Sequence, residues 1–190
     1  MCNAYKIMRI IGGEYKGRKI KQPKQLTVRP TKDRVREAVF NIIAGKVPDS
    51  GVLDLFAGSG AYGLEALSRG AKQAVFVEKN KKTVSVLKEN IQMLELEGHT
   101  AVLAMDVKKG LEFIWQNGQK FDVIFCDPPY SKGIVKKTLN MINHYDILKP
   151  SGLMIIEHHR DESIPPSEGN VFVCKQKSYK NILISVFQKT

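Results

Sequence analysis

The sequence predicts an α/β fold in which seven strands form a mostly parallel sheet, one of them antiparallel, with helices on both faces and a small β-hairpin at the N-terminus. From residue 51 onward, short apolar runs alternate with helical segments, and parallel strands need such crossover connections. The last two apolar runs are separated only by a short turn, which predicts a hairpin and hence one antiparallel strand at or near the sheet edge.

The alternating part begins with the strand predicted at residues 52–56. Further strands are predicted at residues 74–78, 101–105, 121–126, 153–157, 171–175 and 181–188, and helices near residues 61–69, 80–96, 107–117 and 132–147. Ahead of them, two strand-like pieces within residues 8–21 flank three glycines and predict the hairpin. We therefore divide the chain into an N-terminal extension, residues 1–45, and a sheet domain, residues 46–190.

A helix is predicted between the hairpin and the sheet domain. Thr31 is the expected N-cap, and Val35, Ala38, Val39, Ile42 and Ile43 recur at helical spacing on one apolar face. This arrangement leaves Arg34 and Arg36 toward solvent or a ligand.

Length and composition suit a single domain with a small appendage, since 190 residues with 43% hydrophobic content can bury a core. No stretch approaches the roughly 18 apolar residues of a membrane span, and the N-terminus lacks the apolar region of a signal peptide. We expect a cytoplasmic protein.

Three widely spaced cysteines without a C-x-x-C pair predict neither a disulfide framework nor a zinc site, and no metal is expected.

Positive charge is concentrated at the N-terminus. The first 36 residues hold eleven Lys or Arg against two acids, so nine of the eleven net positive charges lie there. A solvated charged face is one explanation. Such one-ended asymmetry is more typical of a surface that binds a polyanion, because each Lys or Arg that neutralises a phosphate releases a counterion.

A glycine-rich segment, VLDLFAGSGAYGLEAL, follows the first sheet strand and opens a helix, where an open parallel sheet binds its cofactor. Gly58, Gly60 and Gly63 spell G-x-G-x-x-G, and Glu78 ends the next strand, which is also the dinucleotide fingerprint. Asp54 discriminates between cofactors, because its carboxylate would repel a pyrophosphate. S-adenosylmethionine has no phosphate and carries a cationic sulfonium and amino group, so the acid favours it.

Each acid near this loop has an expected partner on the cofactor. Glu78 can accept hydrogen bonds from the ribose hydroxyls, and Asp106, after the third strand, can reach the adenine amino group. The glycines let the backbone approach the methionine and ribose without side-chain obstruction. The alternatives are that the loop is only a tight turn and that Asp106 is the N-cap of the helix predicted at residues 107–117.

The strand at residues 121–126 ends on the tetrapeptide Asp127-Pro128-Pro129-Tyr130. Each proline fixes its own φ and pushes the preceding residue toward an extended conformation. Asp127 and Tyr130 are thus held at the sheet rim that carries the glycine loop. A rigid turn with Asp127 as a capping acid is the alternative.

These motifs resemble a known class of enzymes. DLFAGSGAYGLEALSRGA together with DPPY is similar to the Rossmann-like class I S-adenosylmethionine-dependent methyltransferases that modify exocyclic amino groups. MRIIGGEYKGRKI and RPTKDRVREAVFNII extend the resemblance, over nearly the whole chain from residue 8, to the bacterial 16S rRNA guanine-N2 methyltransferases of the small ribosomal subunit. One departure is Tyr179-Lys180, where Tyr-Gly is expected in the last hairpin turn.

The resemblance implies methyl transfer from S-adenosylmethionine to the N2 amino group of a guanine in 16S rRNA, in the small subunit or an assembly intermediate, by a monomer whose residues 46–190 bind the cofactor. Its implied catalytic residues are Asp127, Pro128, Pro129 and Tyr130. The implied cofactor-binding residues are Asp54, Phe56, Ala57, Gly58, Ser59, Gly60, Glu78, Asp106, Val107 and Asp127. The expected RNA-binding residues are Arg9, Lys16, Arg18, Lys19, Lys21, Arg29, Lys32, Arg34 and Arg36.

The chemistry of an amino group explains the tetrapeptide. A guanine amino group is a poor nucleophile because its lone pair is delocalised into the ring. The Asp127 carboxylate and the Pro128 carbonyl can accept its N–H bonds and aim the lone pair at the methyl group, while Tyr130 stacks on the extracted base. An in-line displacement then needs chiefly positioning and electrostatics.

Four other functions remain open at this stage. A DNA adenine-N6 methyltransferase can use the same tetrapeptide, but residues 1–45 are few for a sequence-specific DNA reader. Protein glutamine methylation is usually associated with Asn at the first position of the tetrapeptide. Asp54 disfavours an NAD-dependent oxidoreductase, and a non-catalytic RNA-binding module leaves the glycine loop and Asp127 unexplained.

Overall fold

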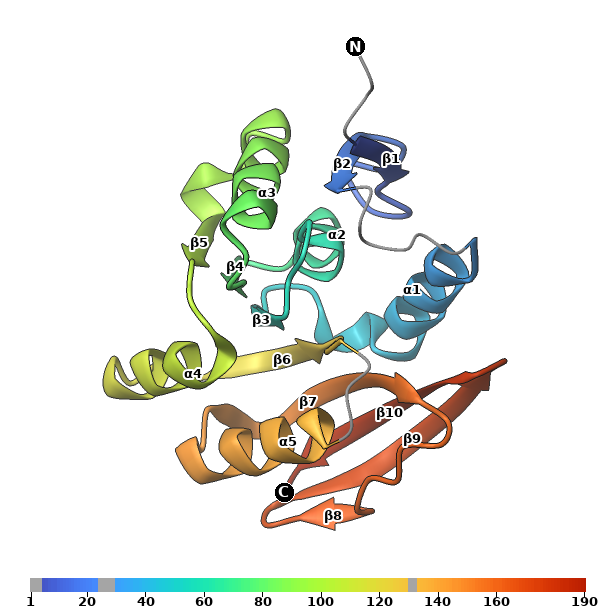
Figure 1. Ribbon diagram of the computed structural model, residues 1–190, viewed down its shortest axis with the longest axis vertical. Coiled ribbons are helices and arrows are strands. Elements are labelled where there is room, and N and C mark those ends of the chain that lie inside the picture. The colour runs from blue at the N-terminus through green and yellow to red at the C-terminus, as the bar shows by residue number, and fades with distance from the viewer. Residues whose placement is uncertain (1–4, 24–29, 130–132) are drawn as a thin grey trace.

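An eight-stranded sheet runs through the computed structural model, which describes residues 5–23, 30–129 and 133–190, with only the backbone described for residues 30–32. Its strands are β3 (Gly51–Leu55), β4 (Gln73–Val77), β5 (Thr100–Leu103), β6 (Phe121–Cys126), β7 (Leu148–His159), β8 (Ser167–Glu168), β9 (Val171–Tyr179) and β10 (Ile182–Lys189). They are ordered β5-β4-β3-β6-β7-β10-β9-β8 (Figure 1). The first five are parallel, and β10 runs antiparallel to both of its neighbours.

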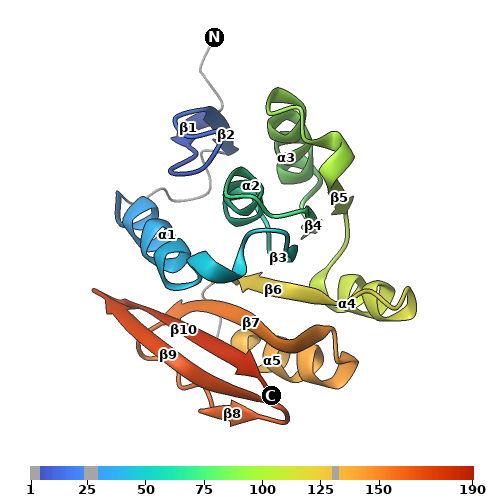
Figure 2. The ribbon, with the colours of Figure 1, turned by 180° about the vertical axis from the view of Figure 1, so that it is seen from behind.

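Five helices cover the two faces of this sheet within the described part of the chain (Figure 2). They are α1 (Pro30–Ile42), α2 (Ala61–Ser68), α3 (Lys81–Met93), α4 (Val107–Gln116) and α5 (Ile134–Tyr145). Buried side chains of α1, α2 and α3 join one apolar cluster, and those of α4 and α5 join a second cluster on the other face. Because helices cover both faces, β3 is buried at every residue.

The predicted order of elements is confirmed, with differences at the boundaries. The two-residue strand β8 was not predicted and extends the sheet beyond β9. The helix α1 begins at Pro30, so Thr31 lies inside it and the predicted N-cap position is wrong. In the β9–β10 turn, Lys180 has φ +55°. It therefore takes the left-handed conformation that glycine adopts at lower cost, and the hairpin still forms.

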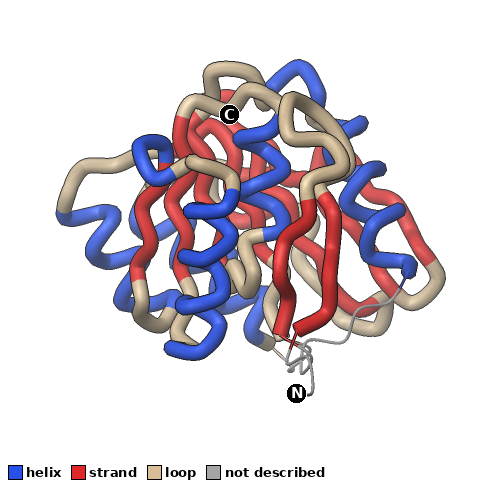
Figure 3. Tube along the Cα trace, turned by 90° about the horizontal axis from the view of Figure 1, so that it is seen from above, coloured by secondary structure: helices blue, strands red, loops and turns tan. Residues whose placement is uncertain are grey.

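The N-terminal hairpin forms a separate two-stranded sheet (Figure 3), and its buried side chains join the same apolar cluster as those of α2 and α3. It consists of β1 (Tyr5–Arg9) and β2 (Lys19–Pro23), which pair antiparallel with Met8 opposite Ile20. Gly13 lies so close to α2 that an added Cβ would be 1.7 Å from the Ser68 carbonyl oxygen, and its φ is +77°. Only glycine fits this approach.

Two buried side chains fix the position of the hairpin. Glu65 of α2 is fully buried and accepts hydrogen bonds from the backbone N–H groups of Ile11 and Gly12, both at 2.8 Å. Its carboxylate also pairs with Arg69, at 2.7 Å, and with Arg36, at 3.7 Å.

From the side of α3, Asn90 accepts a hydrogen bond from the Lys21 N–H at 2.7 Å and donates to the carbonyls of Lys21 and Ser59. The hairpin is thereby joined to two helices and to the glycine loop. Within the described residues, no helix has the length and apolar character needed to cross a bilayer.

Replacing the charge of Glu65 should destabilise the protein. We expect Glu65→Gln to lower the free energy of unfolding by about 3 kcal/mol, because it removes the buried carboxylate charge that faces the guanidinium groups of Arg36 and Arg69. Urea unfolding followed by circular dichroism measures this change. The control is Lys120→Ala, which removes an ion pair between half-exposed side chains and should cost less than about 1 kcal/mol. Equal effects of the two substitutions would contradict a structural role for Glu65.

Candidate active site

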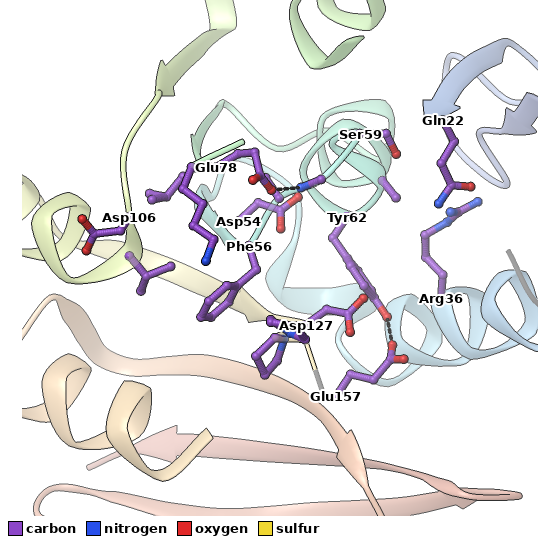
Figure 4. A pocket seen from close by; sticks show the side chains of 18 of the residues that line it. Gln22, Arg36, Asp54, Phe56, Ser59, Tyr62, Glu78, Asp106, Asp127 and Glu157 are labelled. Carbon is purple, nitrogen blue, oxygen red and sulfur yellow. Dashed lines mark hydrogen bonds between the residues drawn. The ribbon is translucent and has the colours of Figure 1, made fainter. Parts of the chain in front are cut away.

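A cavity of about 360 Å³ opens at the carboxyl ends of β3, β4 and β6. Side chains from the glycine loop, the acids after the strands and the N-terminal hairpin converge on it (Figure 4). Of the predicted cofactor-binding residues, those that line the cavity are Asp54, Phe56, Ala57, Gly58, Ser59, Glu78, Asp106, Val107 and Asp127. Parallel strands bring their ends to one rim, so residues far apart in sequence meet there.

The glycine loop is shaped by close packing behind it. Gly60 has φ +85°, and a Cβ there would lie 2.5 Å from Leu87; a Cβ on Gly63 would lie 2.3 Å from the Phe76 ring. Phe56 has φ +58°, a left-handed conformation that is uncommon for an aromatic residue and lies at the cavity wall. Gly60 itself is not among the cavity-lining residues, so its role is to set the turn.

Asp54 lies at the base of the loop with only 3% of its surface exposed. Its carboxylate accepts a hydrogen bond from the Gly63 N–H at 2.9 Å. Burial raises the pKa of Asp54 well above its usual value, the Gly63 hydrogen bond lowers it, and the charges of Asp127 and Glu78 raise it further. The ionised form of Asp54 is therefore unfavourable in the empty cavity, and a cationic ligand beside it would favour that form.

The ends of β4 and β5 supply two more acids. Glu78 accepts hydrogen bonds from the N–H groups of Gly58, at 3.0 Å, and Asn80, at 2.8 Å, and so joins the glycine loop to the start of α3. Asp106 is the N-cap of α4, accepting from the Lys109 N–H at 3.2 Å, and also lines the cavity. The capping role and the cavity position of Asp106 are thus compatible.

The tetrapeptide after β6 reaches the same cavity. Asp127 and Pro129 line it together with Pro128, which is buried. In the strand before it, Cys126 is a core residue, and burial raises the pKa of its thiol. The prediction for Tyr130 lies outside the described residues.

Several cavity residues were missed by the sequence reasoning. Tyr62 and Glu157 share a hydrogen bond of 3.1 Å beside Asp127, and Met8 and Gln22 reach the cavity from the hairpin. The signal for Glu157 was its position at the end of a predicted strand, the same signal that identified Glu78. No pattern in the sequence indicated that the hairpin would face the cavity.

Arg36 requires a correction. It was expected to point from α1 toward solvent or a ligand and to bind RNA, but it is only 3% exposed and lines the cavity next to Gln22. It donates to the Arg9 carbonyl at 2.7 Å and pairs with Glu65. Among the described residues, Gln22 Oε1 is buried without a hydrogen-bond partner, and Arg36 Nε makes no hydrogen bond but lies 3.7 Å from Glu65 Oε2. This end of the cavity can therefore take a polar or charged group.

The other predicted RNA-binding residues divide into three sets. Lys21 is half-buried and paired with Glu89 at 2.8 Å, which raises its pKa. Arg29 and the side chain of Lys32 lie outside the described part of the chain. The exposed ones are Arg9, Lys16, Arg18, Lys19 and Arg34.

The fold and this rim of glycine loop, acids and tetrapeptide are those of a class I methyltransferase, the class of enzyme that takes its methyl group from S-adenosylmethionine. The chain belongs to the family described as "Conserved hypothetical protein 95", which matches residues 8–188.

Named relatives cover nearly the whole chain. It is 35% identical to the "Putative rRNA methyltransferase YlbH" of Bacillus subtilis, over 96% of this chain and 99% of that protein. It is 34% identical to the "Ribosomal RNA small subunit methyltransferase D" of Escherichia coli, over 96% and 90%. The solved structure of the "Putative methyltransferase yhhF" from Escherichia coli, 33% identical, superposes with a TM-score of 0.85 and covers 97% of this chain and 98% of that chain.

The charge of Asp54 should matter for a cationic ligand. We expect Asp54→Asn, which keeps an oxygen for the Gly63 N–H, to weaken binding of S-adenosylmethionine about tenfold or more, since a contact with a charged group is worth about 1.5 to 3 kcal/mol. Binding of S-adenosylhomocysteine, which lacks the sulfonium charge, should change less. Isothermal titration calorimetry measures both affinities.

The pH dependence provides the matched control. Because the pKa of Asp54 is raised, the ligand-free carboxyl gives up its proton only at higher pH. A cationic ligand favours the ionised form, so its affinity in the wild-type protein should rise with pH through the raised pKa. The Asn variant should lack this increase. An equal loss for both ligands, without a pH effect, would contradict an electrostatic role.

Proposed function

We propose that the protein transfers a methyl group from S-adenosylmethionine to the exocyclic N2 amino group of a guanine in 16S rRNA. The observation that carries the proposal is that Asp127-Pro128-Pro129 opens into the same cavity as the glycine loop and its acids. A methyl donor and an amino acceptor can therefore meet in one enclosed space. The names of the rRNA methyltransferase relatives support the choice of substrate.

The cavity fits the proposed cofactor in one orientation. Glu78 and Asp106 would hold the ribose and adenine, since both are acceptors at that end of the cavity. The methionine portion would then extend past Asp54 toward Gln22 and Arg36. The Arg36 guanidinium suits the carboxylate of the methionine portion. Gln22 Oε1, which has no hydrogen-bond partner among the described residues, suits its ammonium group.

The acceptor side depends on Asp127 and the Pro128 carbonyl. Both are hydrogen-bond acceptors, so both can hold an amino group and direct its lone pair. S-adenosylmethionine supplies an electrophilic methyl group. The chain's own contribution is orientation and an acidic environment, which are effective in a site that excludes water.

The exposed basic residues suit a structured RNA. Arg9, Lys16, Arg18 and Lys19 belong to the hairpin, and Arg34 belongs to α1, which also borders the cavity through Arg36. Phosphates bound to this surface would lie next to the site of methyl transfer. A ribosomal particle presents its target base, so a small basic surface is sufficient, whereas a DNA reader must contact several base edges.

Product analysis tests the proposal. Labelled methyl transfer should be measured with 30S subunits, naked 16S rRNA and DNA from a strain that lacks the activity, followed by nucleoside separation. The expected product is N2-methylguanosine in RNA. Label found only in DNA or protein would refute the proposed substrate, and tight NAD binding without affinity for S-adenosylmethionine would refute the enzyme class.

Removing the Asp127 carboxylate should separate chemistry from cofactor binding. We expect Asp127→Ala to lower the rate of methyl transfer about 100-fold or more, with little change in the Kd for S-adenosylhomocysteine. Single-turnover transfer and calorimetry measure the two quantities. Asp161→Ala, at an acid whose side chain is 81% exposed, is the control and should leave both unchanged. Near-normal turnover of Asp127→Ala would exclude the proposed role.

Charge reversal on the hairpin or on α1 should weaken RNA binding. We expect Lys19→Glu and Arg34→Glu to reduce affinity for 16S rRNA most strongly at low salt and to flatten the dependence of log Kd on log salt. Filter binding at several salt concentrations measures this. The matched control is Lys177→Glu, at an exposed lysine of β9, a strand that lies away from the hairpin (Figure 1). If Lys177→Glu weakens RNA binding as much as Lys19→Glu and Arg34→Glu do, the hairpin and α1 are not the specific contact surface.

A further inference from the structure

Two acids lie near the carboxyl ends of the neighbouring strands β6 and β7, at the acceptor side of the cavity. In the register of β6 and β7, Cys126 is opposite Ile156, so the next position places Asp127 beside Glu157. Paired residues of adjacent parallel strands direct their side chains to the same face. Both side chains line the cavity. Asp127 is already assigned to the amino group in the proposed function, but Glu157 has no role there.

Glu157 is held in a fixed orientation. Its side chain is only 3% exposed, and its Oε2 accepts a hydrogen bond from the Tyr62 hydroxyl at 3.1 Å. The Tyr62 ring is itself stacked on Phe125, with centroids 5.0 Å apart, and packs near Phe40. Figure 4 shows Asp127 and Glu157 turned toward the Tyr62 hydroxyl. The two acids and the tyrosine therefore form one preorganised group.

The bases differ in what they would present to such a pair. Guanine carries a ring N1–H donor next to its 2-amino group. In adenine and cytosine, the ring nitrogen next to the exocyclic amino group is unprotonated and is a hydrogen-bond acceptor. An ionised carboxylate can only accept hydrogen bonds, and it has about four lone-pair positions on its two oxygens. It can accept a base N–H in addition to the Tyr62 hydroxyl.

We infer that Glu157 determines the choice of base, by accepting the N1–H of the guanine whose 2-amino group is held by Asp127. This inference rests on the proposed function. An adenine or cytosine in the same position would place its ring acceptor against the Glu157 carboxylate, and a buried pair of acceptors is costly. Tyr62 acts as a positioning residue, because its hydroxyl orients the carboxylate.

A modified base tests the inference directly. The methylated position is first mapped in the wild-type product, and 16S rRNA is then prepared by ligation with either guanine or 2-aminopurine at that position. 2-Aminopurine keeps the 2-amino group but lacks the N1–H. We expect wild-type kcat/KM to favour guanine by about tenfold to a hundredfold. Glu157→Gln should lose most of this preference, because its amide N–H can donate to the unprotonated N1.

Controls separate specificity from folding and net charge. Glu157→Gln must retain wild-type affinity for S-adenosylhomocysteine. Tyr62→Phe should reduce the guanine preference by a smaller factor. Glu97→Gln changes an exposed acid that does not line the cavity, and it should leave the preference unchanged.

The outcomes are distinct. If the wild-type enzyme makes N2-methylguanosine and Glu157→Gln keeps the wild-type preference, the inference fails and the proposed function stands. If the wild-type enzyme makes no N2-methylguanosine, the proposed function fails, and the inference fails with it.

Discussion

The buried carboxylate of Glu65 is the contact on which the arrangement of the other parts depends. It binds two backbone N–H groups of the hairpin and pairs with Arg36 of α1 and Arg69 at the end of α2. A carboxylate removed from water needs such partners. If the hairpin and α1 moved away, the buried charge of Glu65 would lose them. The predicted division at residues 45 and 46 stays a prediction, but the hydrophobic core extends across it. Met8, Gln22 and Arg36 complete the cavity wall as a result.

The second constraint is the common direction of five strands. Their carboxyl ends bring Asp54, Glu78, Asp127 and Glu157 to one rim, although they are spread over about half of the chain. Burial, and to a smaller extent the charges of Asp127 and Glu78, raise the pKa of Asp54, so its ionised form is unfavourable in the ligand-free site. In the proposed function, this unfavourable energy is recovered when a cationic methyl donor binds. The acids nearest β6 and β7 then face the base, which divides the cavity into a donor side and an acceptor side.

Much of this arrangement could be predicted from the sequence because the signals are local. Apolar runs alternating with helical periodicity predicted the sheet and its helices. Glu78 and Asp127 were found because each ends or follows a predicted strand, and Asp54 because it lies in the strand that leads into the glycine loop. Arg36 could not be placed correctly, since its helical face alone does not reveal that Glu65 lies opposite it. Gln22 and Met8 were missed for the same reason: their position depends on how the hairpin docks, which is set by tertiary contacts from Glu65 and Asn90. Glu157 also ends a predicted strand, but it was not predicted to belong to the site.

The central claim is that donor and acceptor share this one cavity in a defined orientation. A crystal structure with bound S-adenosylhomocysteine tests it most directly. We predict that the ribose contacts Glu78, that the methionine end lies near Gln22 and Arg36, and that the sulfur faces the Asp127 carboxylate. A ligand bound in the reverse orientation, or with its sulfur turned away from Asp127, would contradict the account.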